Sequence, residues 1–326
     1  MKSQKIILVT GGAGYIGSAA VKALVKQGHS VVVVDNLSKG LKKLVDKKAK
    51  FYKADLVDQE ALEKVFKNNK NIDTVMHFAA YKAVEESMEN PEKYSDNIIG
   101  TINLLNVMAK HSVKKIIYSS TAAVYGEPEH NPIDENHPTK PVNYYGFTKL
   151  ESEKIIEWHS KIHSINYMIL RYFNVAGDAG LNYTDPEAKN VFPIIMEVIF
   201  GKRNKFMVFG KDYPTRDGTC IRDYVDINDL IRAHLMAIDM KESAIINLGT
   251  SNGVSVKELV DTTFEVTGKK FAVEYGERRK GDPAELFASN EKAKRLLAWQ
   301  PEKNIKDMIK STYDAYKKNM KQKIKH

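Results

Sequence analysis

The chain is poor in cysteine: among its 326 residues there is only one, Cys220. A single cysteine cannot form a disulfide within the chain, which excludes the disulfide-framework class and favours a reducing compartment, so we expect a cytoplasmic protein. No apolar run approaches the roughly 20 residues that a membrane-spanning helix requires. The apolar stretch 6–9 near the start is too short for the core of a signal peptide. We therefore expect no membrane partner.

Positively charged residues are in modest excess over negatively charged ones. Lysine and arginine number 50 against 41 acidic residues, which gives a formal net charge of +9. Such a balance can indicate nucleic acid, a membrane surface or acidic small substrates. Part of the excess lies in residues 42–43, 47–48 and 317–326, which lack interleaved aromatic residues and any nucleic-acid motif. We interpret these runs as solvated and expect no nucleic-acid partner.

Apolar runs alternate with helical patterns in the first half of the chain. Strands are predicted at residues 5–10, 30–35, 50–54, 74–79, 115–120 and 167–173, and helices at residues 16–27, 60–67, 91–111 and 148–163. Continuous β-branched strands joined by helical crossovers are typical of a parallel sheet that is covered on both faces. The fold class that we predict is α/β, a doubly wound parallel sheet of the Rossmann type.

The pattern changes after Phe173. Residues 174–190 are rich in Gly, Asp and Asn and predict a long loop, which in a compact domain tends to be functional. Shorter strand and helix signals follow. We predict a dinucleotide-binding domain at residues 1–175 and a smaller α/β substrate domain at 176–326, with a soft boundary and segments near 225–250 that interleave with the first domain.

A glycine-rich turn follows the first predicted strand and opens the first predicted helix. Gly11, Gly14 and Gly17 stand three residues apart, around Tyr15 and Ile16. Glycines in this context permit a tight turn, close approach of the backbone to a pyrophosphate, and close packing of helix on strand. Alone the pattern is a weak signal, but its place between a strand and a helix predicts a dinucleotide site.

Polar and small residues end the strands that follow this turn. Asp35 ends the second strand, where a carboxylate can accept hydrogen bonds from the adenosine ribose and repel a 2′-phosphate, so we predict NAD rather than NADP. The alternative is that Asp35 and Asn36 only cap a turn. The carboxyl ends of parallel strands face the ligand crevice. The residues at the next two strand ends are Asp55, Leu56, Phe78, Ala79 and Ala80.

A tyrosine and a lysine four residues apart mark the candidate catalytic region. Tyr145 and Lys149 share a face of a helix, so an ammonium can lie beside a phenol whose free pKa is ~10. A nearby cation, and the positive nicotinamide ring, would favour the phenolate. Most such pairs are only surface pairs, but Thr121 follows the fifth strand and could bond a sugar hydroxyl. The nine histidines show no ligand-spaced cluster, and we expect no metal.

Six separated motifs, in the right order, carry a resemblance to a known family. They are residues 9–18 (VTGGAGYIGS), 34–37 (VDNL), 119–126 (SSTAAVYG), 170–174 (LRYFN), 209–224 (FGKDYPTRDGTCIRDY) and 279–283 (RKGDP). The chain resembles the extended short-chain dehydrogenase/reductase family, and within it the UDP-glucose 4-epimerases, over nearly its whole length. Asp226 departs from the pattern, because the family usually has a histidine there.

The resemblance implies a site for each ligand. Residues that would contact NAD include those at the glycine turn and strand ends, together with Lys82, Asn97, Tyr145, Lys149 and Phe173. Residues that would hold the UDP-hexose are Thr121, Asn174, Asn190, Arg222, Tyr224, Arg279, Asp282 and Leu286. Two arginines can neutralise a diphosphate, although each could instead form a structural ion pair, Arg222 with Asp223 for example.

The activity that the resemblance implies is reversible inversion at C4 of a UDP-hexose, which interconverts UDP-glucose and UDP-galactose through a 4-keto sugar. Tyr145 would be the base, Thr121 would orient the hydroxyl and Lys149 would support the phenolate. Related dehydratases and decarboxylases carry acidic residues directly after the threonine, where this chain has Ala122 and Ala123. A noncatalytic protein that binds NAD and acts as a regulator is the third class of function that we consider. The resemblance also implies a homodimer, paired through helices near 91–111 and 148–163.

Overall fold

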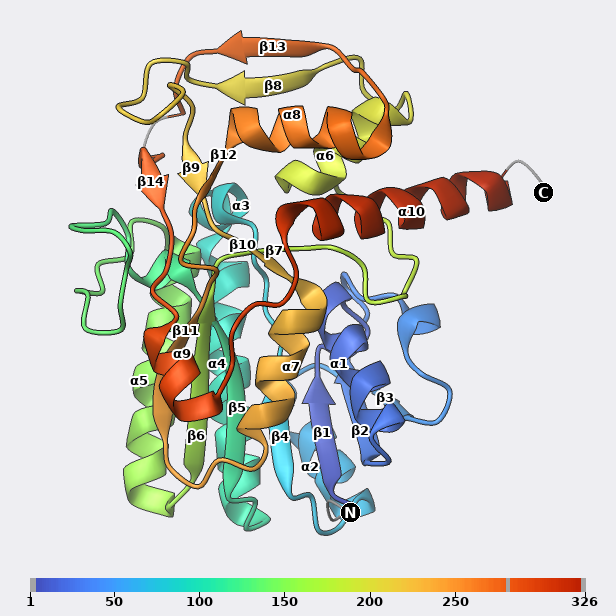
Figure 1. Ribbon diagram of the computed structural model, residues 1–326. Coiled ribbons are helices and arrows are strands. Elements are labelled where there is room, and N and C mark those ends of the chain that lie inside the picture. Colours follow the sequence, from blue (N-terminus) through green and yellow to red (C-terminus); the bar gives the residue numbers. More distant parts are fainter. Residues whose placement is uncertain (1–3, 280–281, 324–326) are drawn as a thin grey trace. The chain divides into compact units, whose positions relative to one another are not determined.

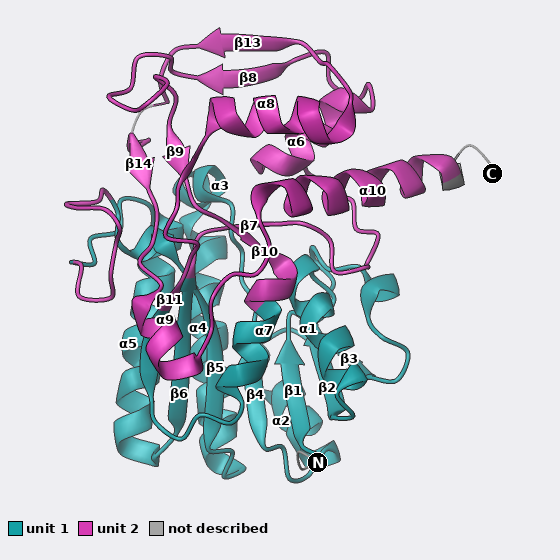
Figure 2. Ribbon diagram, viewed as in Figure 1, with its two compact units in different colours: residues 1–126, 138–171, 231–246 teal, residues 127–137, 172–230, 247–326 magenta. Residues whose placement is uncertain are grey.

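The computed structural model describes residues 4–279 and 282–323 (Figure 1). Two residues of the 279–283 motif, Lys280 and Gly281, and the end of the basic tail lie outside the described residues. The chain divides into two compact units (Figure 2). Unit 1 contains residues 1–126, 138–171 and 231–246, and unit 2 contains residues 127–137, 172–230 and 247–326.

A seven-stranded sheet forms the framework of unit 1 within the described part of the chain. Its strands, in the order in which they pair, are β11 (Ala244–Leu248), β6 (Asn166–Tyr172), β5 (Lys115–Thr121), β4 (Thr74–His77), β1 (Ile6–Thr10), β2 (Ser30–Asp35) and β3 (Lys50–Lys53). The pairs β1–β2, β1–β4, β2–β3 and β4–β5 are parallel. The order reverses beside β1, which is the switch point of a doubly wound sheet. The predicted fold class is confirmed.

Helices cover both faces of this sheet. They are α1 (Tyr15–Lys26), α2 (Gln59–Asn68), α3 (Val84–Glu89), α4 (Pro91–Lys110) and α5 (Tyr144–His163), with 3₁₀ turns η1 (Lys42–Leu44) and η2 (Ala122–Val124). Right-handed crossovers place α1 on one face and α2, α4 and α5 on the other, because the chain moves outward from β1 and then returns across it. Contacts between α2 and α4, and between α4 and α5, agree with this arrangement.

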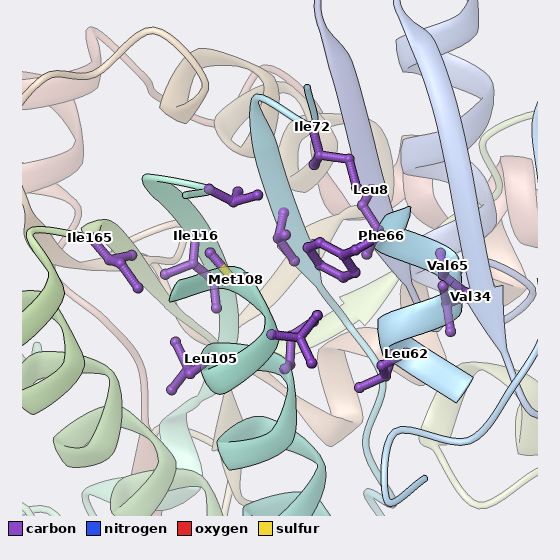
Figure 3. Packing of buried hydrophobic residues seen from close by; sticks show 14 of the residues in the cluster. Leu8, Val34, Leu62, Val65, Phe66, Ile72, Leu105, Met108, Ile116 and Ile165 are labelled. Atoms are coloured by element: carbon purple, nitrogen blue, oxygen red, sulfur yellow. The ribbon is translucent and has the colours of Figure 1, made fainter. Parts of the chain in front are cut away.

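The α2–α4–α5 face encloses a buried apolar cluster (Figure 3). Phe66 of α2 lies at its centre, among Leu8 and Ile116 of the sheet and Leu105 and Met108 of α4. All five side chains are at most 1% exposed. Complete burial of a side chain of this size stabilises a fold by about 1.5–3 kcal/mol. The amphipathic pattern of these helices is therefore the main reason why they dock on the sheet.

Helix α5 begins earlier than the sequence pattern predicts, at Tyr144 rather than Thr148. Asn143 is its N-cap, and the Asn143 side chain accepts a hydrogen bond from Gly146 N at 2.8 Å. Such a cap satisfies one of the backbone N–H groups that a helix start leaves without a partner. The cap brings Tyr145 into the first turn of the helix, on the same element as Lys149.

Unit 2 is built from short strands and helices around its own core. Its elements are β7 (Asn174–Ala176), α6 (Val191–Ile199), β8 (Phe206–Phe209), β9 (Ile221–Arg222), β10 (Tyr224–Asp226), β12 (Val254–Ser255), α8 (Val256–Thr267), β13 (Val273–Gly276), β14 (Glu285–Leu286), α9 (Glu291–Leu297) and α10 (Ile305–Lys323). Helix α7 (Ile227–Ala237) begins in unit 2 and ends in unit 1.

The loop predicted for residues 174–190 is interrupted at its start. Residues 174–176 form strand β7, which pairs in parallel with β10. Sequence patterning missed this strand because three residues are too few to show an alternation. Asp226, at the end of β10, accepts a hydrogen bond from Asn228 N at 2.8 Å and so stabilises the start of α7. None of the described helices is long and apolar enough to cross a bilayer.

His77 gives the fold a specific sensitivity to acid. Its ring is buried, with Nδ1 2.7 Å from Thr10 Oγ1 and Nε2 3.1 Å from Thr101 Oγ1. Burial, and then the charge of Lys149, lowers the pKa of His77 to about 3 from 6.5. The unfolded chain therefore takes up this proton first as the pH falls. The stabilising contribution is complete above pH 6.5 and is lost towards pH 3, by about 1.4 kcal/mol per pH unit.

We expect His77→Gln to reduce the loss of stability between pH 6.5 and pH 4.5, relative to the unmodified chain. Urea unfolding at a series of pH values measures this slope. His130→Gln is the matched control, because His130 is an exposed histidine. Equal slopes in the two variants would contradict the assignment.

Candidate active site

The glycine-rich turn between β1 and α1 depends on the absence of side chains at two positions. Gly11 has φ +69°, and a Cβ there would lie 2.6 Å from Ala79 N, at the end of β4. A Cβ on Gly17 would lie 2.1 Å from Gly11 O. Gly14 precedes α1 as its N-cap and, within the described residues, no side chain caps this helix start. The turn therefore presents backbone N–H groups, as a pyrophosphate requires.

Asp35 links the glycine turn to the end of β2. Its carboxylate accepts hydrogen bonds from Ala13 N at 2.9 Å and Leu37 N at 2.8 Å. The turn-capping role considered from the sequence is thus present, but each carboxylate oxygen has capacity for a further bond. Asn36 Nδ2 donates to Asp55 Oδ2 at 2.8 Å, so these three strand-end residues form one polar edge.

The other residues expected to contact NAD differ in exposure. Six of them, at the turn and the strand ends, are partly exposed: Tyr15, Ile16, Leu56, Phe78, Ala79 and Ala80. Lys82 is exposed. The Asn97 amide is buried and already bonded, to both Tyr81 backbone groups and, at 3.2 Å, to Thr148 Oγ1. The Asn97 side chain is therefore fixed by Tyr81 and Thr148, and Phe173 falls in unit 2.

These features fit a dinucleotide. At Gly11 and Gly17 the glycine turn has no room for a Cβ, no side chain caps the helix start at Gly14, and the turn stands beside an acidic residue at the end of β2. A diphosphate suits the amides, and ribose hydroxyls suit the carboxylate. Within residues 4–279 and 282–323, no group of three or more His, Cys, Asp and Glu side chains could hold a metal ion.

Tyr145 is held next to Thr121 by a close backbone approach. A Cβ on Gly146 would lie 2.5 Å from Ala123 O, so only glycine lets the first turn of α5 come this near to η2. Tyr145 N donates to Ser87 Oγ at 3.1 Å, which fixes the turn from the α3 side. The Thr121 hydroxyl lies near enough to the Tyr145 phenol to favour the phenolate and so to act against a rise of the phenol's pKa. The sequence did not identify Gly146 as functional, although it lies inside the tyrosine–lysine motif.

Lys149 is buried one helical turn further on. Its Nζ donates to Ser119 O at 2.7 Å and stands 4.4 Å from the centre of the Tyr118 ring. Burial lowers the pKa of Lys149 to about 7, against an opposing effect of Glu153. Burial also raises the pKa of Tyr145 to about 12, and the nearby Thr121 hydroxyl opposes this rise. The expectation that Lys149 lowers the tyrosine pKa therefore differs from the structure, in which desolvation of the phenol dominates.

Unit 2 contains a guanidinium group with an unused donor. Arg222 Nη1 donates to the backbone oxygens of Ile221 and Pro283, at 2.8 and 2.9 Å. Its buried Nη2 makes no hydrogen bond and lies 3.3 Å from Asp282 Oδ1. The ion pair with Asp223 that we considered is not formed, because the Asp223 carboxylate accepts bonds from Thr250 instead. Arg222 instead lies beside Asp282, so the alternative of a structural ion pair is present with a different aspartate.

The remaining expected substrate residues are distributed over unit 2. Arg279 is exposed, with its guanidinium 4.0 Å from the centre of the Phe209 ring. Tyr224 is buried in the core of unit 2, where its ring meets the edge of Phe192. Asn174 Nδ2 donates to Asp223 O at 3.1 Å. Asn190 precedes α6 and is exposed, and Leu286 pairs with Arg222 across β14 and β9.

The sequence analysis did not predict one buried ion pair, between Arg171 and Glu153. Arg171, on β6, donates from Nη2 to Glu153 Oε2 at 2.5 Å, and from Nε to both carboxylate oxygens. Both side chains are at most 6% exposed. Glu153 lies four residues after Lys149 in α5 and therefore on the same face. The 170–174 motif contains Arg171, but nothing in the sequence indicates its partner.

Comparisons with known proteins agree with this geometry. Residues 7–249 match the family model described as the NAD dependent epimerase/dehydratase family. A UDP-glucose 4-epimerase of Streptococcus mutans is 45% identical, with 94% of this chain and 95% of the relative covered.

Solved structures give the same result. A crystal structure of a UDP-glucose 4-epimerase has a TM-score of 0.93 and 46% identity, covering 97% of this chain and 98% of that one. A UDP-glucose 4-epimerase from Bifidobacterium longum, solved in complex with NAD+ and UDP, has a TM-score of 0.90 and 38% identity, covering 97% and 99%.

The doubly wound sheet, glycine turn and tyrosine–lysine helix define a dinucleotide-dependent enzyme of the extended short-chain dehydrogenase/reductase type. The family model, which matches residues 7–249, identifies the family within this class. The chain belongs to the NAD dependent epimerase/dehydratase family, and within it to the UDP-glucose 4-epimerases.

Proposed function

We propose that this protein interconverts UDP-glucose and UDP-galactose by inverting C4 of the hexose. The observation that carries the proposal is the close approach of the first turn of α5, with Tyr145, to the η2 turn after Thr121, beside the buried Lys149, in a chain that is similar to UDP-glucose 4-epimerases over nearly its full length. A hydroxyl can bind and orient a sugar hydroxyl, a phenol can take and return its proton, and an ammonium can stabilise the phenolate.

Each of these three residues has a distinct role in the proposal. Tyr145 Oη takes the proton of the C4 hydroxyl and later returns it. Thr121 bonds that hydroxyl and orients it. Lys149, when protonated, stabilises the phenolate by its positive charge. NAD held at the glycine turn would supply the hydride acceptor and donor for C4, and the 4-keto sugar would have to present its opposite face before the hydride returns.

The chain's own residues hold both ligands in this proposal. The residues proposed to hold NAD are Gly11, Gly14, Tyr15, Ile16, Gly17, Asp35, Asn36, Asp55, Leu56, Phe78, Ala79, Ala80, Lys82, Asn97, Tyr145, Lys149 and Phe173. In unit 2, Arg222 and Arg279 neutralise the diphosphate, and Asp282 accepts from the uridine ribose. Asn174, Asn190 and Tyr224 complete the proposed substrate set. Binding energy from the nucleotide is remote from the reacting carbon, as is common in enzymes.

Elimination chemistry is the principal alternative, and the residues after Thr121 disfavour it. A dehydratase needs further groups that transfer protons, and the η2 turn has Ala122 and Ala123 there, of which Ala122 is 6% exposed. A noncatalytic NAD-binding regulator would have no need of the Thr121, Tyr145 and Lys149 arrangement. We also propose a cytoplasmic location, since the lone Cys220 suits a reducing compartment.

We propose that two copies of the chain pair through α4 and α5. These helices pack side by side and carry exposed apolar side chains: Ile99 on α4, and Phe147, Trp158 and Ile162 on α5, each at least 41% exposed. Exposed apolar patches of this kind mark interaction surfaces, and a second copy would cover them. A symmetric pairing would bring the same two helices from each copy together.

The first prediction from the proposed function tests the base. We expect Tyr145→Phe to keep the fold and NAD binding but to lose about 10²–10⁴-fold in kcat for UDP-galactose conversion, since only the ionisable hydroxyl is removed. Tyr144→Phe is the matched control: the Tyr144 hydroxyl lies 2.8 Å from Ser95 Oγ, and its loss should leave turnover near normal. Near-normal turnover in Tyr145→Phe would overturn the assignment, and no conversion of UDP-galactose by the unmodified protein would overturn the reaction.

The second prediction concerns the sugars that fit. Leu286 and Arg222 are paired residues of a parallel ladder, so their side chains project from the same face of the sheet. Leucine leaves more room beside the hexose than tyrosine would. We expect measurable activity on UDP-N-acetylhexosamines, below that on UDP-glucose and UDP-galactose. Leu286→Tyr should lose only the N-acetyl activity, by about 10–200-fold in kcat/KM. Leu286→Met, of similar volume, is the control, and no N-acetyl activity in the unmodified protein would contradict the prediction.

The third prediction concerns the pairing of copies. We expect a dimer at micromolar concentration by light scattering, and a monomer for Trp158→Glu, because a buried unpaired carboxylate is costly. Lys64→Glu adds a carboxylate at an exposed position of α2, outside the α4–α5 face, and should remain dimeric. A monomeric unmodified protein would refute the pairing.

A further inference from the structure

A buried acid and base stand directly behind the proposed catalytic residues. Glu153 of α5 and Arg171 of β6 form a bidentate ion pair, with Nε–Oε1 3.0 Å and Nη2–Oε2 2.5 Å. Glu153 is 2% exposed and Arg171 5% exposed. Taking two charges out of water is expensive, and replacing such a pair with apolar residues often stabilises a protein. Folding stability alone therefore does not account for this ion pair, and its position next to the proposed catalytic residues indicates a role in the site.

The ion pair links the elements that carry the proposed chemistry. Ser120 Oγ donates to Glu153 Oε1, and Ser120 precedes Thr121 at the end of β5. Arg171 Nη1 donates to Tyr125 Oη at 3.1 Å, directly after the η2 turn. One carboxylate thus connects α5, the end of β5 and β6, all of them in unit 1. A shift of Glu153 would move Thr121 relative to the helix of Tyr145.

Glu153 also supplies the negative charge that acts on Lys149. Around the ammonium stand Ser119 O and the Tyr118 ring from β5, and His77 from β4, which burial keeps neutral. Desolvation lowers the pKa of Lys149, and Glu153 opposes that effect. Arg171 holds Glu153 in place with three hydrogen bonds.

We propose that Glu153 is a positioning residue that keeps the Lys149 ammonium charged and fixes Thr121 relative to Tyr145, with Arg171 holding the Glu153 carboxylate. This inference rests on the proposed function, because it assigns Glu153 a role in supporting the same proton transfer. Glu153 acts through Lys149 and Ser120 and touches neither substrate nor cofactor.

The experiment follows the titration of Lys149 directly. Protein labelled with ¹³Cε-lysine gives an NMR signal for each lysine, and the signal that disappears in Lys149→Met is that of Lys149. We expect Glu153→Gln to lower the titration midpoint of Lys149 by about one pH unit, since an opposite charge nearby shifts a pKa by that order. Glu157→Gln, the same change one turn further along α5, should leave the midpoint unchanged, because Glu157 bonds Tyr167 at 3.3 Å instead.

Activity gives a second readout. A midpoint that falls from about 7 to about 6 reduces the charged fraction about tenfold at pH 8 and about twofold at pH 6. We therefore expect kcat/KM of Glu153→Gln to fall by these factors, and Glu153→Asp, which keeps the charge, to recover most of the loss at pH 8. A loss that is equal at both pH values would indicate a structural role and overturn the proposal.

A double variant keeps the test decisive if Glu153→Gln, which leaves Arg171 buried without a partner, fails to fold. Glu153→Gln/Arg171→Gln removes both charges at once. If Glu153 acts on Lys149, the double variant retains the lowered midpoint. If Glu153 only neutralises Arg171, the double variant has the normal midpoint, and the proposal is wrong.

The two hypotheses fail separately. The lysine titration needs no substrate and no turnover, so an unchanged midpoint overturns the role of Glu153 whatever the enzyme does. Absence of UDP-galactose conversion in the unmodified protein overturns the proposed reaction instead.

Discussion

The cost of burying an ammonium group shapes the end of strand β5. Lys149 is 3% exposed, and its Nζ has one backbone partner, Ser119 O, and one aromatic face, Tyr118. A charge in such surroundings is unstable unless the protein provides opposing charge or dipoles. Glu153, one turn away, provides it, and Arg171 in turn holds Glu153. Because these partners come from β5, α5 and β6, the elements must pack in one arrangement for the charge to survive. The same arrangement places the proposed base beside Thr121.

A second constraint, steric rather than electrostatic, acts at the turn between β1 and α1. The absence of Cβ atoms at Gly11 and Gly17 lets the β1–α1 turn close against the end of β4 and against itself. Asp35 then ties that turn to the end of β2. Both constraints lie at the carboxyl ends of parallel strands, where side chains and backbone amides from several elements converge. Rigid strands thus position the dinucleotide features and the proton-transfer features independently.

Features carried by neighbouring residues were predictable from the sequence. The sheet followed from the alternation of apolar runs and amphipathic stretches, and the glycine turn from its own spacing. Features that depend on distant residues were not. Arg171 lies in a recognisable motif, but its partner Glu153 is on another element, and no pattern in the sequence joins them. The pKa direction at Tyr145 was also missed, since a helix spacing shows a neighbouring lysine but not the desolvation of the phenol. Strand β7 was too short to give a pattern.

The raised pKa of Tyr145 suits a reaction that must give the proton back. A sugar hydroxyl is a very weak acid, and proton transfer in both directions is easiest when donor and acceptor have similar affinities for the proton. A phenol near pKa 12 is closer to that match than one at ~10, but its anion is scarcer at neutral pH. A positive charge beside it offsets the scarcity, which is the part assigned to Lys149. Burial therefore affects Tyr145 and Lys149 together: it makes the phenolate a stronger base, and it makes the ammonium that supports the phenolate less stable. Glu153 opposes the weakening of that cation, so the buried carboxylate and the proposed proton transfer belong to one electrostatic arrangement.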